Sequence, residues 1–307
     1  MKMQPVLLVP YYKDYIWGGT KLKSLYNKKS NLPKIAESWE LSCHPDGLSK
    51  VDSFFNPQSL WSTLEKNGLR ENLGTAWNGE GFPILVKLID AEKNLSVQVH
   101  PDNEYARLHE NDNGKTEFWY VLDCEPDAFI YYGFSKPVTP EEIHERIENA
   151  TLREVLNKVP IKKGDSFLIK AGTVHALSAG SMIVEIQQSS NVTYRLWDYN
   201  RMDENGNFRE LHIDKALEVA DLNPSKTHIS PGHIIKSEYF TVDRFFDNST
   251  FFVEESSFCH LLCLNGEGTF CWEGGFLPVK KGSSIFIPAG IGKCYMKGNS
   301  SGLLITM

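Results

Sequence analysis

The sequence lacks the features that would assign it to a membrane or to a secreted disulfide framework. It has no run of about 18 or more apolar residues, so no membrane-spanning helix is expected. The apolar stretch near the N-terminus is short, is broken by Pro10 and has no small-residue cleavage site, so no signal peptide is expected. The six cysteines include no Cys-x-x-Cys pair, which favours buried reduced thiols and a cytoplasmic protein.

An excess of positive charge is also missing. The 307 residues carry 32 Lys and Arg against 39 Asp and Glu, a formal net charge of -7. Such a chain has no general attraction for nucleic acid or an anionic membrane, so an anionic substrate must be held by a local basic pocket. Hydrophobic residues at 41% and charged residues at 23% are typical of a globular protein, and the length allows two cores.

An internal repeat indicates the architecture. Residues 162–175 read KKGDSFLIKAGTVH, residues 280–293 read KKGSSIFIPAGIGK, and the two align without gaps. Each copy has a glycine turn, a short apolar strand and a second glycine turn, where glycine supplies the backbone freedom that short loops need. The repeat predicts two β-barrels of one type. Because His175 ends the first copy and Lys293 the second, only the first barrel is expected to hold a metal.

Short segments rich in β-branched and aromatic residues surround the first copy, and helical patterns interrupt them. ILVKLID, SVQVH, TEFWYVLD and SMIVEIQQ are predicted to be strands. Capping boxes at Thr139 and Thr151 predict helical structure over about 139–158. Apolar residues at helical spacing predict a further helix over about 211–221.

The predicted domain boundary is Asp221-Leu222-Asn223-Pro224, where the last of these helices ends. Residues 1–224 are then a metal-binding barrel domain with helical segments. Residues 225–307 return to strand patterns and form a second, degenerate barrel without metal ligands. The fold class predicted in this way is mainly β.

Several polar residues lie in or beside strands that are otherwise apolar. Gln98 and His100 are two residues apart, so they share one face of a strand. Glu117 opens an apolar strand, where it needs either a metal or a surface pair with Lys115, because an unpaired buried charge is expensive. His175 follows a glycine turn. Alone, each has an ordinary surface interpretation, but together they can surround one divalent ion with a position open for water or substrate. One Zn²⁺ per chain is expected, although such ligands also accept Co²⁺, Mn²⁺ or Fe²⁺.

Long contiguous motifs resemble those of the class I mannose-6-phosphate isomerases, in their short bacterial form. The motifs are QVHPDNEYARLHENDNGKTEFWYVLD and AGTVHALSAGSMIVEIQQSSNVTYRLWDYNR, and Trp17-Gly18-Gly19 and Glu37-Ser38-Trp39-Glu40 look like N-terminal elements of the same family. The resemblance runs to about Leu222. It implies a pair of cupin-type double-stranded β-helix (jelly-roll) barrels, which agrees with the repeat.

The resemblance also implies a reaction and roles for individual residues. It implies interconversion of mannose 6-phosphate and fructose 6-phosphate, in which a proton moves between C2 and C1 by way of an enediolate. Arg195 is the implied catalytic residue, and the implied zinc ligands are Gln98, His100, Glu117 and His175.

The base that moves the proton stays open at this level. Glu185 is one candidate, because burial inside an apolar strand would raise its pKa toward the working range. Lys115 is the second, as a proton shuttle or a phosphate contact, and a metal-assisted hydride shift is a further alternative. Arg195 has a structural alternative too, an ion pair with Glu185 or Asp198.

Two other classes of protein compete with the isomerase. An iron-dependent cupin dioxygenase usually has a histidine-rich first motif, whereas Gln98-Val99-His100 has one histidine. A non-catalytic sugar-binding cupin would not need Lys115, Glu185 and Arg195. The remaining histidines have no ligand-like company or lie on charged helical faces, and no individual role is assigned to Arg201, Arg209 or His212; those histidines are His44, His109, His144, His228, His233 and His260.

Overall fold

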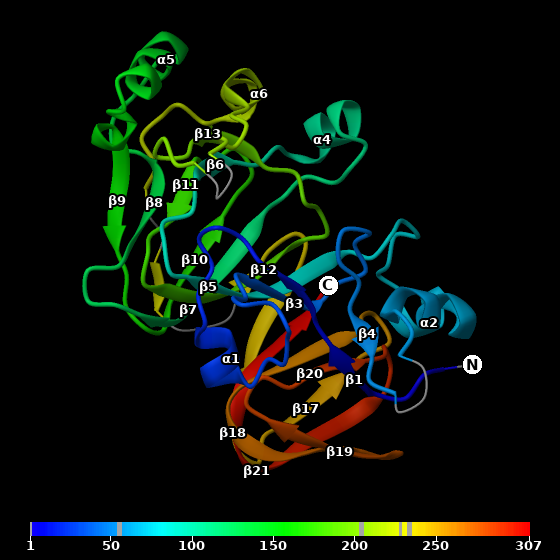
Figure 1. The fold of residues 1–307 in the computed structure, drawn as a ribbon. Coiled ribbons are helices and arrows are strands. Elements are labelled where there is room, and N and C mark those ends of the chain that lie inside the picture. The colour runs from blue at the N-terminus through cyan, green and yellow to red at the C-terminus, as the bar shows by residue number, and fades with distance from the viewer. Residues whose placement is uncertain (1, 54–56, 203–205, 227–228, 232–234) are drawn as a thin grey trace.

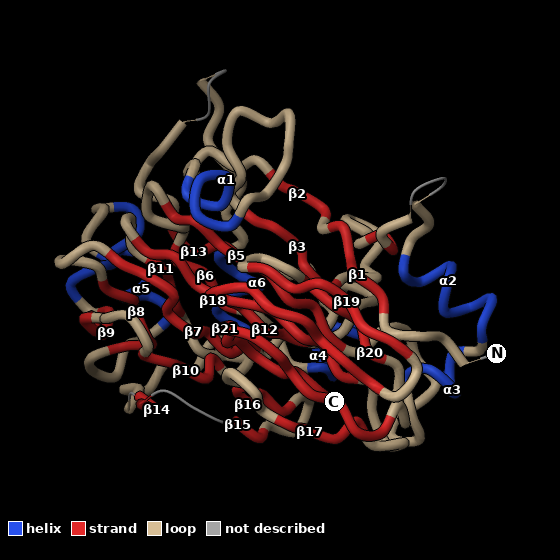
Figure 2. Tube along the Cα trace, turned by 90° about the horizontal axis from the view of Figure 1, so that it is seen from below, coloured by secondary structure: helices blue, strands red, loops and turns tan. Residues whose placement is uncertain are grey.

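The computed structural model describes residues 2–53, 57–202, 206–226, 229–231 and 235–307 (Figure 1). The predictions made for His228 and His233 fall outside these residues. Strands dominate the described chain (Figure 2), so the prediction of a mainly β fold is confirmed.

Two antiparallel sheets build the first barrel. The seven-stranded sheet runs in the order β14-β10-β7-β12-β5-β3-β2, and the five-stranded sheet in the order β13-β6-β11-β8-β9. The strands of the first sheet are β2 (Tyr11–Lys13), β3 (Glu37–Leu41), β5 (Ile84–Ala91), β7 (Glu117–Cys124), β10 (Asp165–Ile169), β12 (Ser181–Gln188) and β14 (Ile229–Pro231). Those of the second are β6 (Val97–Val99), β8 (Phe129–Phe134), β9 (Leu156–Pro160), β11 (His175–Leu177) and β13 (Tyr194–Trp197).

A nine-stranded sheet curls into the second barrel. Its main path is β15-β16-β21-β18-β20-β1-β4, with β17 paired to β21 and β19 paired to β18. The strands are β1 (Val6–Val9), β4 (Lys50–Val51), β15 (Ile235–Lys236), β16 (Thr241–Phe245), β17 (Thr250–Val253), β18 (Cys259–Trp272), β19 (Gly275–Lys280), β20 (Ser284–Ile287) and β21 (Gly292–Thr306). Phe270, Ile285 and Met296 are among the buried residues of its interior.

The predicted repeat has the same local structure in both barrels. Gly164 and Gly282 have left-handed φ angles of 92° and 88°, which favour glycine at both turns. The amide of Gly164 donates to the Val121 carbonyl at 2.9 Å, and that of Gly282 donates to the Cys263 carbonyl at 2.8 Å. Each turn is therefore tied to the neighbouring strand in the same way, which confirms the prediction of two related barrels.

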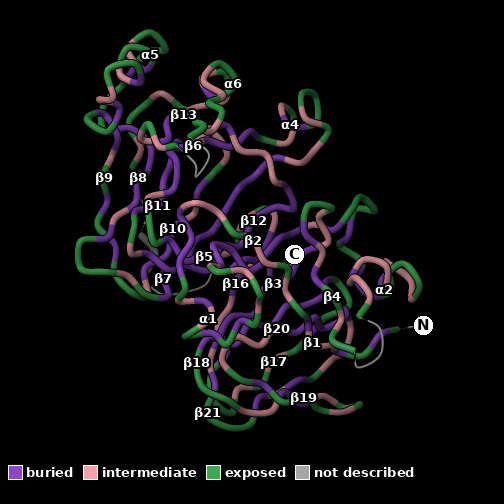
Figure 3. Tube along the Cα trace, in the orientation of Figure 1, coloured by how far each residue is buried: buried purple, intermediate pink, exposed green. Residues whose placement is uncertain are grey.

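The central strands of the seven-stranded sheet are buried on both faces. One face packs inside the first barrel, where Trp119, Phe167 and Ile183 belong to one core cluster. The other face packs against the second barrel in a cluster that includes Val184 and Phe286. Every residue of β5 and β12 is buried as a result (Figure 3), so any polar side chain on these strands must find a partner.

Sheet pairing crosses the predicted domain boundary in both directions. β1 pairs with β20, so the N-terminal strand belongs to the sheet of the second barrel (Figure 1). β14, which follows the boundary, pairs with β10 of the first barrel. The boundary at residues 224 and 225 stays a prediction, and the sheets alone do not divide the chain at one point.

The helices are short, and three of them lie at the end of the first barrel away from the second (Figure 1). Those three are α4 (Asn103–His109), α5 (Pro140–Glu148) and α6 (Ile213–Val219). The others are α1 (Lys21–Tyr26), α2 (Leu60–Asn67), α3 (Leu69–Leu73) and the 3₁₀ turn η1 (Leu152–Glu154). No helix in the described part of the chain is long and apolar enough to cross a membrane.

The predicted helical segment over 139–158 is correct only in its first half. Thr139 caps α5 by accepting from the Glu142 amide, and Pro140 occupies the first turn, as expected. Ala150 then takes a left-handed φ of 55°, which ends the helix. The hydroxyl of Thr151 caps nothing, a single 3₁₀ turn follows, and the chain enters β9. The helix predicted over 211–221 is confirmed as α6.

Candidate active site

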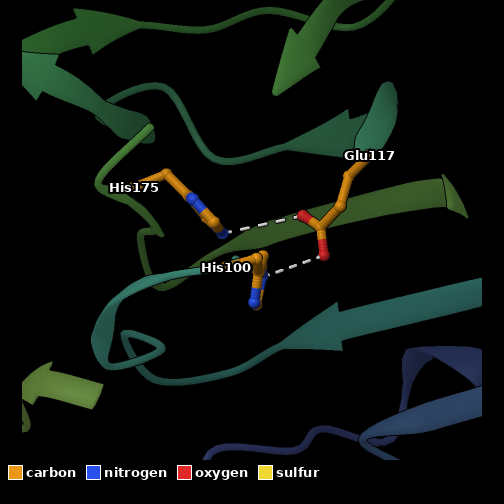
Figure 4. Close-up of side chains that lie close together, drawn as sticks. All are labelled: His100, Glu117 and His175. Atoms are coloured by element: carbon orange, nitrogen blue, oxygen red, sulfur yellow. Dashed lines mark ion pairs between the residues drawn. The ribbon is translucent and has the colours of Figure 1, made fainter. Parts of the chain in front are cut away.

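His100, Glu117 and His175 converge from three separate parts of the first barrel. Glu117 opens β7, His175 opens β11, and His100 follows β6. The Nε2 atom of His100 lies 3.1 Å from Glu117 Oε1, and Nε2 of His175 lies 3.6 Å from Glu117 Oε2 (Figure 4). All three side chains are buried, and their ligand atoms lie within 4.8 Å of one another. Within the described residues, this is the one cluster of three or more His, Cys, Asp or Glu that is compact enough to hold a metal.

The backbone fixes the tautomer of both histidines. Nδ1 of His100 lies 2.8 Å from the carbonyl oxygen of Val192, and Nδ1 of His175 lies 2.8 Å from that of Thr173. A carbonyl oxygen only accepts, so each Nδ1 carries the proton and donates it. Each Nε2 therefore turns a lone pair toward Glu117, the arrangement in which imidazole binds a metal.

Gln98 completes the predicted group. It lies on β6, opposite His175 of β11 on one side and Arg195 of β13 on the other. Its amide nitrogen is 3.4 Å from His175 Nε2. A half-turn of the amide places oxygen in that position, so the same side chain is able to face a cation.

Lys115 and Glu117 form an ion pair, but not the surface pair considered from the sequence. Lys115 Nζ lies 2.7 Å from Glu117 Oε1 and 3.2 Å from His100 Nε2, and all three side chains are buried. Burial alone would raise the pKa of Glu117, but the Lys115 ammonium outweighs it and holds that pKa well below its usual range. Burial and the same ammonium lower the pKa of His100 to about 3.

This donor set fits a divalent cation. The group combines an ionised carboxylate, two neutral imidazoles and an amide, which is the protonation state that metal binding requires. Oε2 of Glu117 is buried without a hydrogen-bond partner among the described residues, and Oε1 lies 2.7 Å from the Lys115 ammonium. Buried acceptors of this kind, flanked by imidazole lone pairs, are satisfied by a positive charge placed between them.

A cavity of about 270 Å³ adjoins the cluster of Gln98, His100, Glu117 and His175, which we call the metal group because its donors fit a metal ion. Four of the residues predicted from the sequence line it, namely Gln98, Lys115, Glu185 and Arg195. In all, four basic and two acidic side chains face this space, in a chain whose net charge is -7. The cavity is therefore the local basic pocket that an anionic substrate needs.

Arg195 is not held in a structural ion pair. Its Nη1 donates to the Glu210 carbonyl at 2.6 Å, and its Nε donates to the Ser96 hydroxyl at 3.3 Å. Asp198, the partner considered from the sequence, binds Arg209 instead, through Nε–Oδ2 at 2.7 Å. No carboxylate of the described residues lies within ion-pair distance of Arg195, and its side chain lines the cavity.

Glu185 has a partner that sequence reasoning missed. Its Oε1 lies 3.0 Å from Lys87 Nζ, and its Oε2 accepts from the Trp119 indole at 2.9 Å. Burial, with the charge of Glu117, raises the pKa of Glu185 despite the ammonium of Lys87. Lys87 also lies 3.7 Å from Glu37 Oε2. The sequence did contain a signal for this partner, namely a lysine inside the apolar run ILVKLID. The pairing of β5 with β12 places that lysine directly opposite Glu185.

Aromatic rings border the same cavity. Tyr15 and Trp17 both line it, and their rings stack at 5.5 Å. The other histidines of the described chain lie outside the metal group. His260, for example, is buried in the second barrel, with Nε2 2.8 Å from the Ser284 hydroxyl.

Fold and site together are those of a cupin-type protein with a buried cluster of side chains that fits a metal ion. The family model for the phosphomannose isomerase type I catalytic domain matches residues 6–122, and the model for the mannose-6-phosphate isomerase cupin domain matches residues 232–306. Mannose-6-phosphate isomerase ManA of Bacillus subtilis (strain 168) is 35% identical over 311 residues, covering 97% of each chain. This chain belongs to the type I phosphomannose isomerase family.

Solved structures agree with this assignment. The crystal structure of mannose 6-phosphate isomerase from Bacillus subtilis superposes with a TM-score of 0.88 at 33% identity, covering 99% of this chain and 100% of that one. A zinc-bound mannose 6-phosphate isomerase shares the fold at 18% identity, with a TM-score of 0.75 and 99% of each chain covered. These relatives favour the isomerase over the dioxygenase and the non-catalytic cupin that the sequence left open.

Proposed function

We propose that the chain is a zinc-dependent aldose–ketose isomerase that interconverts mannose 6-phosphate and fructose 6-phosphate. The observation that carries this proposal is the carboxylate of Glu117, buried between two imidazole lone pairs beside a basic cavity. Gln98, His100, Glu117 and His175 would hold one metal ion per chain. The zinc of a relative with the same fold supports the choice of metal.

A bound divalent cation would supply Lewis-acid polarisation of the substrate's oxygens. Arg195 contributes a fixed charge of its own, from the strand next to Gln98. Two of its nitrogens already donate to the backbone carbonyl of Glu210 and to the hydroxyl of Ser96, and these hydrogen bonds restrict the guanidinium to one orientation. A charge held in this way stabilises negative charge that develops on a substrate oxygen, at no cost of reorganisation during the reaction.

Proton transfer is assigned to Glu185 before Lys115. Burial raises the pKa of Glu185, which makes its carboxylate a stronger base, and the side chain lines the cavity. Lys87 and Trp119 orient that carboxylate through its two oxygens. The Lys115 ammonium is committed to Glu117 and lines the cavity, which suits it to contact the substrate or its phosphate.

The state of the cysteines supports a cytoplasmic location. All six are free, and four of them are buried. Free thiols in this number are typical of proteins kept in a reducing compartment.

An activity assay on protein of known metal content tests the proposal. We expect about one zinc ion per chain by elemental analysis and conversion of mannose 6-phosphate to fructose 6-phosphate by the purified protein. A chelator should abolish the conversion, and added Zn²⁺ should restore it. Full activity in chelated protein that contains no metal would reject the metal-dependent mechanism, and metal-loaded protein without isomerase activity would reject the reaction.

A further inference from the structure

Gln187 is a buried residue of the site to which the reaction gives no role so far. It lies on β12, is fully buried, and stands directly opposite Glu117 of β7 in the antiparallel register. Side chains two residues apart on a strand project from the same face. Gln187 therefore shares the face of Glu185, which lines the cavity, and of Glu117, the carboxylate of the metal group.

The orientation of the Gln187 amide is determined by its neighbours. Its Nε2 donates to the carbonyl oxygens of Gln188 at 2.8 Å and Ser190 at 2.7 Å. Because carbonyls only accept, nitrogen and oxygen cannot be exchanged here. The amide oxygen is left buried, and the described residues supply no donor to it. An acceptor left unpaired in this way is destabilising, so it calls for a donor.

The amide nitrogen of Gln187 connects to a metal ligand through a short chain of hydrogen bonds. Nε2 of Gln187 donates to the carbonyl of Ser190, and the hydroxyl of Ser190 accepts from the Val192 amide at 3.3 Å. The carbonyl of Val192 in turn accepts from Nδ1 of His100 at 2.8 Å. Gln187 thus braces the segment 188–192, and that segment sets the orientation of the His100 ring. Outer partners of this type commonly tune metal affinity.

We propose that Gln187 is a positioning residue of the metal group. Its amide nitrogen fixes the segment 188–192 and, through Val192, the His100 ring. Its amide oxygen accepts a hydrogen bond from a water molecule held beside Glu117. The inference rests on the proposed function, because it requires the metal site.

Replacing Gln187 by Met keeps the length of the side chain and removes its donors and its acceptor. We expect the dissociation constant for Zn²⁺, measured by competition with a coloured chelator, to rise about 10–100-fold. The visible absorption spectrum of the Co²⁺-loaded variant should also differ from that of the wild type, because a less restrained His100 changes the coordination geometry.

Asn72 offers a matched control on α3. It is buried, and its Nδ2 donates to two carbonyls, those of Asn67 at 3.1 Å and Gly68 at 2.6 Å, while its oxygen accepts from the Met3 amide. Asn72→Leu removes an equivalent buried clamp away from the metal group. It should lower the unfolding temperature and leave both Zn²⁺ affinity and the Co²⁺ spectrum unchanged.

The outcomes separate this inference from the function on which it rests. Wild-type protein that binds no Zn²⁺ would reject the metal site itself. Wild-type affinity and spectrum in Gln187→Met, or an equal loss of affinity in Asn72→Leu, would overturn the positioning role. If Gln187→Met does not fold, Ser190→Ala decides, since it removes the next link, and wild-type affinity there overturns the role of the segment. A crystal structure of the zinc-loaded protein with no water within about 3.2 Å of the Gln187 oxygen would overturn the part assigned to that oxygen.

Discussion

The buried Lys87–Glu185 pair allows the role of Glu185 to be tested by one isosteric change. Glu185→Gln keeps the shape of the side chain and removes its charge. The side chains of Lys87 and Glu185 are only 4% and 5% exposed and lie 3.0 Å apart, while Glu37 lies 3.7 Å from the same ammonium. The variant therefore leaves Lys87 buried with one counter-charge in place of two.

The structure gives the size of the effect. With an effective dielectric constant of about 20, Coulomb attraction is about 5.5 kcal/mol for the contact at 3.0 Å and about 4.5 kcal/mol for the contact at 3.7 Å. Removing one partner of a buried pair costs about 3–5 kcal/mol. Because Glu37 retains almost half of the attraction, we expect Glu185→Gln to lower the free energy of unfolding by about 3 kcal/mol, measured by urea denaturation of the zinc-loaded protein.

Turnover distinguishes a base from an ion-pair partner. If Glu185 is the base, turnover should fall by about a hundredfold or more, with metal content unchanged. In the wild type, kcat/KM should decline as the pH falls through the raised pKa of Glu185, since protonation removes the base, and this decline should be absent in the variant. Lys87→Met combined with Glu185→Gln removes the stranded ammonium but leaves Glu37 without its cationic partner, so it should restore at most part of the stability and none of the turnover. Near-normal turnover in Glu185→Gln, or recovery of turnover with stability in the double variant, would refute the assignment.

Three further predictions concern Arg195, the metal group and a buried histidine of the second barrel. Arg195→Ala should lower kcat and kcat/KM together by about a hundredfold while zinc stays bound; a rise in KM alone would assign Arg195 to the phosphate instead. His175→Ala should lose the metal by elemental analysis, whereas Lys293→Ala should retain it, and a metal that remains in the first or disappears in the second would contradict the one-site interpretation. Burial lowers the pKa of His260 to about 3, so the unfolded chain binds the proton first and stability falls as the pH drops below about 6.5, by up to about 1.4 kcal/mol per pH unit. His260→Gln should reduce that acid slope relative to the wild type, while His144→Gln, at an exposed position, should not; equal slopes in all three proteins would contradict this account.

Local patterns predicted much of the site because polar residues stand out in apolar strands. Gln98, His100, Glu117 and His175 were each readable from strand parity or from a glycine turn, and the structure brings them together. The barrels followed from the repeated turns, whose glycines take the same backbone conformation in both copies.

Side-chain partners that depend on strand register could not be predicted from the sequence. Lys87 meets Glu185 only because β5 and β12 pair in one register, and a shift of one residue would turn either side chain to the opposite face. The sequence suggested the Lys115–Glu117 ion pair. It could not predict that the pair is buried, because burial depends on the sheet that faces these residues. The strand at residues 156–160 was mistaken for helix because a capping pattern describes only the first turn and not the tertiary contacts that follow.

Both ends of the chain are held in one sheet. β1 pairs with β20, and β21, the last strand, runs beside β18 in the same sheet. Most of the first barrel is therefore formed by chain that lies between strands of the second barrel's sheet. The seven-stranded sheet of the first barrel also packs against the second barrel through a common core. Neither barrel can lose its structure without exposing apolar surface of the other, so the enzyme should melt in a single cooperative step. On the proposed function, the second barrel would then contribute to catalysis indirectly, as the support that keeps the strands of the site in register.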